Sequence, residues 1–142
     1  MANPFVHIEL NTDDATKAKK FYRRVFDWKL SDTKMGPGMT YTMLDVGKGT
    51  GGGIQKKQMA GAPTAWLPYV EVDDVKKTIA KAKKAGAQIM VEHMEIPGMG
   101  SFGIFVDPTG AGLGVWQTAP KGRRAAAKPK KKAPAKRASK AR

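Results

Sequence analysis

The sequence of 142 residues contains no cysteine. Disulfides, thiolate metal sites and a cysteine nucleophile are therefore excluded, and a reducing compartment is expected. No apolar run approaches the roughly 20 residues that a membrane-spanning helix needs. The first residues, Met1 to Pro4, do not form the basic and then apolar segment of a signal peptide. Together these absences predict a soluble cytoplasmic protein without a membrane segment.

Acidic residues are also absent from residues 119–142, which hold eleven of the 26 Lys and Arg residues. Residues 1–118 contain the other fifteen Lys and Arg residues and all twelve acidic residues, so most of the net charge of +14 comes from residues 119–142. Its Lys, Ala and Pro composition predicts a disordered tail, and it resembles the tails of linker histones. Such tails neutralise phosphates without reading base sequence. We expect nonspecific contact with nucleic acid or another polyanion, the alternative being a solubilising tail. The expected contacts are Lys128, Lys130, Lys131, Lys132, Lys136 and Arg137.

Residues 1–118 repeat one pattern and predict a single domain. An alternating run over residues 5–10 is followed by two aspartates and a helical pattern, and the same succession starts again at residue 67. Each copy continues through alternating segments separated by glycine-rich turns, which predict strands. The expected class is therefore α+β, with two βαβββ repeats facing each other across a cleft. Helices are expected at about 14–26 and 74–85, and strands at about 5–10, from 28, 39–46, 54–55, 66–72, 88–95, 101–106 and 113–117.

The first strand and the first helix each have two unlike faces. On the strand, Phe5, His7 and Glu9 alternate with Val6, Ile8 and Leu10, so the aliphatic set is expected under the helices and the other set at the cleft. On the helix, apolar residues recur at a spacing of three and four, which predicts a buried stripe. The residues expected in this core stripe are Ala18, Phe21, Tyr22, Val25 and Phe26.

The chain resembles the vicinal-oxygen-chelate superfamily, which includes glyoxalase I, bleomycin-resistance proteins and extradiol dioxygenases. The segments that carry the resemblance are Val6 to Leu10, Asp14 with Phe21-Tyr22, Val25 to Trp28, Val72 to Val75, Ala85 to Ala87, Pro97 to Gly100, Phe105 to Ala111 and Gly114 to Gln117. The resemblance implies a curled mixed sheet around a shared cavity, and many members dimerise, so a homodimer is expected as an option. It does not fix the chemistry, because this fold carries several activities.

Enzymes of this superfamily hold a divalent metal with His, Gln or Glu from four strand positions. Carried over to this chain, these positions hold His7, Tyr69, Gly114 and the region of Gln55. Only His7 is a sure ligand, and catalytic metal sites use about three protein ligands. We therefore expect no metal at the family site and no other cofactor. The alternative is a rearranged metal site of His7, Glu9, Gln55 and Glu71.

Aromatic walls with a few polar groups are typical of small-molecule pockets. Three functions follow: a metal-independent binding protein for an unidentified small molecule, which we favour; a metal-dependent lyase, isomerase or dioxygenase; and a nucleic-acid-associated protein acting through its basic tail. No catalytic residue is assigned. The residues expected to line the cleft are His7, Glu9, Tyr41, Gln55, Tyr69, Glu71 and Trp116.

Overall fold

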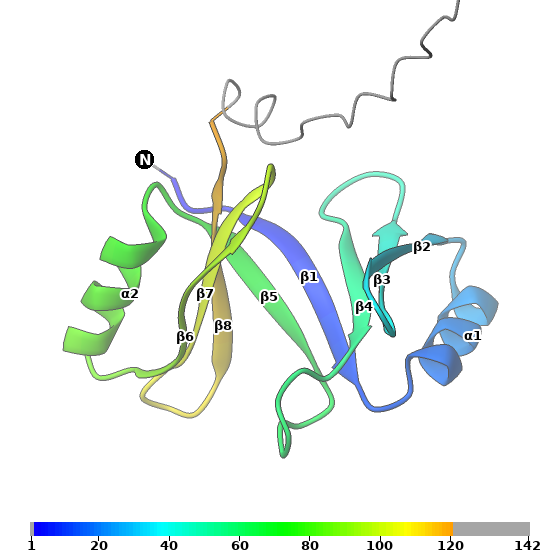
Figure 1. Ribbon diagram of the computed structural model, residues 1–142, viewed down its shortest axis with the longest axis horizontal. Helices are drawn as coiled ribbons and strands as arrows, with labels where there is room; N and C mark the ends of the chain where they lie inside the picture. Colours follow the sequence, from blue (N-terminus) through cyan, green and yellow to red (C-terminus); the bar gives the residue numbers. More distant parts are fainter. Residues whose placement is uncertain (1, 121–142) are drawn as a thin grey trace, which may run out of the picture.

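The computed structural model describes residues 2–120 and shows one eight-stranded mixed sheet that curls into a half-barrel (Figure 1). The predicted α+β class and the two βαβββ units are confirmed. The tail and the six basic residues expected to contact nucleic acid lie outside the described residues. The first unit consists of β1 (Phe5–Thr12), α1 (Ala15–Val25), β2 (Lys29–Gly36), β3 (Met39–Asp45) and β4 (Gly52–Lys56). The second consists of β5 (Ala65–Glu71), α2 (Val75–Lys84), β6 (Gln88–Ile96), β7 (Gly100–Val106) and β8 (Gly112–Thr118).

The strand order is β2-β3-β4-β1-β5-β8-β7-β6, so the two units meet where β1 pairs antiparallel with β5. Within each unit the first strand pairs in parallel with the last, β1 with β4 and β5 with β8. The centre of the sheet is therefore built from the first and last strands of each repeat, in the order β4, β1, β5 and β8. The helices lie at the two outer flanks in Figure 1. No helix of residues 2–120 is both long and apolar enough to cross a membrane.

Both helices begin in the same way because both repeats place an aspartate before the helix. The side chain of Asp14 accepts a hydrogen bond from the Lys17 backbone N–H at 3.0 Å, and that of Asp74 accepts one from Lys77 at 3.0 Å. Such caps satisfy N–H groups that have no partner within the helix. After α2, Gly86 has a φ of 105°, the left-handed conformation that favours glycine at a helix end.

The core is divided into two clusters, one under each helix. Under α2, Val75 and Ile79 pack with Val72 and Val115, and all four are buried. Under α1, Leu10, Leu44 and Ile54 are buried, and the α1 residues Ala15, Ala18 and Tyr22 pack against them. Leu10 therefore faces the helix-bearing side of β1, as its alternation with Glu9 predicts.

The prediction that all five apolar residues of the first helix are core is wrong for three of them. Phe21, Val25 and Phe26 are exposed by 56%, 51% and 44%, and no residue of α1 is fully buried. The apolar stripe of this helix is wider than the part that the sheet covers. Helical spacing identifies such a stripe but does not show how much of it a neighbouring element reaches.

Because α2 buries its apolar side chains more fully than α1 does, truncating such a side chain is expected to cost more stability in α2. We expect Ile79→Ala to lower the free energy of unfolding by about 2–5 kcal/mol, because a cavity is left under α2. We expect Phe21→Ala to lower it by less than about 1 kcal/mol, since most of that ring already contacts water. Urea unfolding of the two variants and the parent measures both values. Equal costs would show that Phe21 is covered in solution.

Candidate functional site

Alternation along β1 places His7, Glu9 and Asn11 on the face opposite Leu10. We call this side of the sheet, with Tyr41 of β3 and Tyr69 of β5, the concave face. Tyr69 lies opposite His7 where β5 pairs with β1. Tyr41 reaches the same place from β3, and its hydroxyl contacts both His7 and Glu9. Residues from both repeats thus meet on β1 at the middle of the sheet.

A connected hydrogen-bond network surrounds the Glu9 carboxylate. The Tyr41 hydroxyl donates to Glu9 Oε2 at 2.8 Å, and the Tyr69 hydroxyl donates to Oε1 at 3.3 Å. Asn11 Nδ2 also donates to Oε1, at 3.4 Å, and Gln55 Nε2 donates to Asn11 Oδ1 at 3.0 Å. Side chains from four strands, β1, β3, β4 and β5, are therefore linked to a single carboxylate, which fixes the polar groups of the face relative to one another.

His7 extends this network on the other side of Tyr41. Its Nε2 lies 2.7 Å from the Tyr41 oxygen. Because the Tyr41 hydroxyl hydrogen is directed at Glu9, the phenolic oxygen accepts from His7, and the neutral ring then carries its proton on Nε2. This tautomer makes Nδ1 an acceptor, and no residue of the range 2–120 forms a hydrogen bond with it. The result is a relay from the imidazole through the phenol to the carboxylate.

The electrostatics of the concave face follow from burial. Glu9 is only 7% exposed. Burial lowers the pKa of His7 from its ordinary 6.5, an effect that the nearby Glu9 charge partly opposes. Burial also raises the pKa of both Tyr41 and Tyr69, and the Glu9 charge raises them further. At neutral pH the imidazole is therefore uncharged and both phenols keep their protons, so they act as hydrogen-bond donors.

Two glycines explain how the tyrosine rings fit beside the sheet. A Cβ atom on Gly53 of β4 would overlap the Tyr41 ring, and one on Gly114 of β8 would overlap the Tyr69 ring. These glycines stand on the last strand of each repeat, where the resemblance places metal ligands. In each repeat a tyrosine ring from a neighbouring strand fills the space that such a ligand would need.

A metal therefore does not fit the residues present at the family positions. His7 is the one strong ligand there, while Gln55 is engaged with Asn11 and the other two positions are Tyr69 and Gly114. Among residues 2–120, no three or more His, Asp or Glu side chains gather closely enough to hold a metal ion. The rearranged set of His7, Glu9, Gln55 and Glu71 is thus not assembled as a metal site within this part of the chain.

Glu71 and Trp116 form a second group, separate from the network around Glu9. They pair across β5 and β8. Trp116 Nε1 donates to Thr118 Oγ1 at 2.9 Å, and that hydroxyl donates to Glu71 Oε2 at 3.4 Å. The structure therefore joins five of the seven residues expected to line the cleft, with Gln55 linked through Asn11. The other two lie apart from the network, Glu71 further along β5 and Trp116 on the neighbouring β8.

Sequence reasoning missed Asn11, Phe102 and two methionines of this face. Phe102 packs edge-on to Tyr69, with ring centroids 6.1 Å apart. Met39 and Met43 flank Tyr41 on β3 and are exposed by 43% and 42%. Asn11 and the methionines follow the same alternation as Glu9 and Tyr41, so the strand period could have found them. Phe102 lies on β7. Which side of the sheet its side chain occupies could not be predicted without knowing how β7 pairs with β8.

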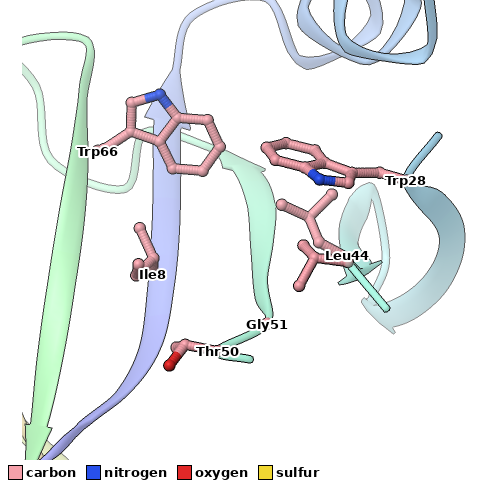
Figure 2. Close-up of a pocket in the computed structure, with 7 residues that line it drawn as sticks. Ile8, Trp28, Leu44, Thr50, Gly51 and Trp66 are labelled. Carbon is pink, nitrogen blue, oxygen red and sulfur yellow. The ribbon is translucent and has the colours of Figure 1, made fainter. Parts of the chain in front are cut away.

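An apolar hollow of about 180 Å³ lies on the helix-bearing side of the sheet, away from the concave face (Figure 2). Figure 2 shows Trp28 and Trp66 beside each other over Ile8 and Leu44. Thr50 supplies one hydroxyl, and the lining contains no titratable side chain. The hollow can accommodate apolar groups, but it offers no acid, base or charge. The chemistry of the described residues is therefore concentrated around Glu9. The complete lining is Ile8, Trp28, Leu44, Val46, Thr50, Gly51 and Trp66.

Comparisons with known proteins agree with this architecture. The family model described as Glyoxalase/Bleomycin resistance protein/Dioxygenase superfamily matches residues 5–115. The protein CFP32 of Mycobacterium tuberculosis, which its name proposes to be a glyoxylase, is 38% identical over 112 residues. That match covers 79% of this chain and 43% of CFP32, so the chain spans less than half the length of this relative. The anthracycline biosynthesis protein DnrV of Streptomyces peucetius is 32% identical over 57 residues, which is 40% of this chain and 21% of DnrV.

Solved structures resemble the chain in fold at low sequence identity. The protein BH1468 of Bacillus halodurans superposes with a TM-score of 0.64 at 13% identity, covering 84% of this chain and 97% of its own. Methylmalonyl-CoA epimerase of Mycobacterium tuberculosis superposes with a TM-score of 0.61 at 14% identity, covering 82% and 89%. At these identities the likeness concerns the fold alone.

Proposed function

Since the chain belongs to the Glyoxalase/Bleomycin resistance protein/Dioxygenase superfamily, we propose that it binds a small organic molecule on its concave face without the family's metal. The observation that carries this proposal is the pair of tyrosine rings beside Gly53 and Gly114. These rings take the place of metal ligands and present two hydroxyls to Glu9 instead. A site built in this way offers hydrogen bonds and aromatic surface rather than coordination.

Each group of the concave face has a role in this proposal. The rings of Tyr41, Tyr69 and Phe102 supply apolar contact area, and Glu9 with His7 supplies the polar groups that orient a ligand. Ligand pockets commonly combine an aromatic and apolar lining with a few fixed polar groups. Because the network holds these groups in place, little ordering entropy is lost on binding. Glu71 and Trp116 extend the same surface along β5 and β8.

A metal-dependent lyase, isomerase or dioxygenase is the main alternative, and methylmalonyl-CoA epimerase is one enzyme among the structural neighbours. In that case affinity for substrate would depend on an added divalent ion. We favour the metal-independent function because the two glycine positions would need side chains to complete a ligand set. A cytoplasmic location and a homodimer stay predictions.

The function is tested by a thermal-shift screen of the full chain against small organic molecules, in excess EDTA and with added divalent metal. A ligand that binds the folded protein raises its apparent stability. We expect hits in EDTA that Tyr41→Phe weakens by about 5- to 30-fold, since a hydroxyl of the network is lost while the ring remains. Glu92→Gln, on the exposed part of β6, serves as the control and should change nothing. Hits that need metal would favour the enzyme alternative.

A second candidate function, association with nucleic acid, is favoured by where the body carries its charge. Ten of the fifteen basic residues of residues 1–118 lie on α1 and α2, and neither helix contains an acidic residue. These helices stand on the outer flanks of the half-barrel (Figure 1). Basic surfaces of this kind bind phosphate backbones without base specificity.

The tail residues predict a salt-sensitive affinity for duplex DNA. We expect the full chain to lose affinity steeply with salt, with a slope near 0.9 per phosphate neutralised. Replacing the six expected contacts by glutamine should flatten that slope, because fewer counterions are released. Fluorescence anisotropy over a salt series compares the two chains. An unchanged slope would mean that the tail is a solubilising segment. The six contacts are Lys128, Lys130, Lys131, Lys132, Lys136 and Arg137.

A further inference from the structure

The Glu9 carboxylate is buried without a cationic partner. The described residues form two ion pairs, Lys19 with Asp32 and Lys57 with Asp13, and neither involves Glu9. Its partners within this part of the chain are the two phenols and Asn11, all neutral donors. Buried charges are usually paired, because neutral donors offset only part of the lost hydration. The carboxylate therefore leaves a negative potential at the floor of the concave face.

Among the described residues, the two oxygens of this carboxylate accept different numbers of hydrogen bonds. Oε1 accepts from Tyr69 and Asn11, whereas Oε2 accepts from Tyr41 alone. A carboxylate oxygen can accept two hydrogen bonds. The free acceptor position is thus on the oxygen that lies toward Tyr41 and, beyond it, His7.

The two phenols that donate to Glu9 belong to a group of neighbouring aromatic rings. The His7 ring lies 5.8 Å from Tyr69 and 6.3 Å from Tyr41 between centroids, and Phe102 packs against Tyr69. The faces of aromatic rings attract cations, and the attraction grows when the site excludes water.

We propose that the concave face recognises an organic ammonium cation, with its charge directed at Glu9 and its apolar groups against the rings of Tyr41, Tyr69 and Phe102. This inference rests on the proposed binding function and adds the ligand class. Met39 and Met43 flank the site with flexible side chains, which adapt to apolar groups of different shape. The site therefore selects for charge more than for the outline of the ligand.

Because the chain has a net positive charge, a preference for cationic ligands would point to the site itself and not to general electrostatic attraction. A protein of net charge +14 repels cations at long range, although salt screens this repulsion beyond about 8 Å. A general electrostatic attraction would favour anions. A preference for a cation would therefore come from groups at the site itself, the Glu9 carboxylate and the aromatic rings, and not from the net charge of the chain.

Three planar probes of similar size test the inference on the full chain. They are 1-methylquinolinium, which is permanently cationic, quinoline, which is neutral at mildly basic pH, and 2-naphthoate, which is anionic. Isothermal titration gives the three affinities. We expect the cation to bind at least about tenfold more tightly than quinoline, because the Glu9 carboxylate and the ring faces both attract its charge, and we expect the anion to bind weakest.

Glu9→Gln keeps the size of the side chain and removes its charge. We expect it to lower the affinity for 1-methylquinolinium by about tenfold and that for quinoline by much less, because only the cation loses the attraction of the carboxylate charge. Glu92→Gln removes one charge from an exposed position of β6 and should leave all three affinities as they are. The comparison of the three probes on the unmodified chain needs no variant, so it decides the question even if Glu9→Gln does not fold.

Two results overturn the ammonium inference. One is equal binding of the three probes, or tightest binding of the anion, with hits of the wider screen still sensitive to Tyr41→Phe; the binding function would then stand with another ligand class. The other is an absence of binding for the three probes and for every compound of the screen, in which case the proposed function falls with it.

Discussion

Gly114→Glu is expected to destabilise the fold by several kcal/mol rather than to restore a metal site. Even the first carbon of a side chain at this position would overlap the Tyr69 ring. Overpacking of this kind costs about 1–3 kcal/mol, and a buried carboxylate without a cation adds to that cost. Gly114 is itself buried between β5 and β7.

Chemical denaturation of the parent, Gly114→Ala and Gly114→Glu measures the effect. Gly114→Ala isolates the steric part, since it adds the clashing carbon without charge. We expect stability to fall in the order parent, Gly114→Ala, Gly114→Glu. A Gly114→Ala variant as stable as the parent would show that the Tyr69 ring does not fill this space in solution.

Tyr69→His combined with Gly114→Glu is expected to create divalent-metal affinity that the parent lacks. The first change removes the ring that occupies the space, and the second supplies a carboxylate in it. With His7 the double variant would offer three ligands of the types that zinc and related metals bind. The double variant should also be more stable than Gly114→Glu alone, because residues in contact couple non-additively.

Elemental analysis after purification without chelator checks this expectation. We expect no stoichiometric metal on the parent and at least a hundredfold gain in zinc affinity for the double variant, from the two added ligands. Tyr69→Phe with Gly114→Glu is the matched control and should bind no metal. About one metal ion per parent chain, lost in His7→Ala, would contradict the account and favour the enzyme alternative.

The order of the helices and strands could be predicted because the same pattern of residues occurs twice in the sequence. Each repeat has an alternating strand and an aspartate cap, and both caps form the same bond in the structure. The face of β1 could also be predicted, since Leu10 and Glu9 must lie on opposite sides of the strand. The burial of α1 could not, because Phe21 and Phe26 satisfy the helical period whether or not the sheet reaches them.

The residues of the candidate site could be predicted from the sequence better than the hydrogen bonds between them. Strand alternation places His7, Glu9, Tyr41 and Tyr69 on one side, but their hydrogen bonds depend on the curl of the sheet and on strand order. The sequence shows that Gly114 lacks a ligand side chain. That the Tyr69 ring fills the space beside Gly114 depends on the folded arrangement of β5 and β8 and could be seen only in the structure. Trp66 is expected only as the start of a strand, and the structure places it at the apolar hollow with Trp28.

The most direct test of metal-independent binding on the concave face is amide chemical-shift mapping. Spectra of the full chain would be recorded in excess EDTA, with and without the tightest-binding compound of the screen. The account predicts shifts centred on His7, Glu9, Tyr41 and Tyr69, with little change near Trp28 in the apolar hollow. Shifts centred on the hollow instead, or shifts that appear only after divalent metal is added, would contradict it.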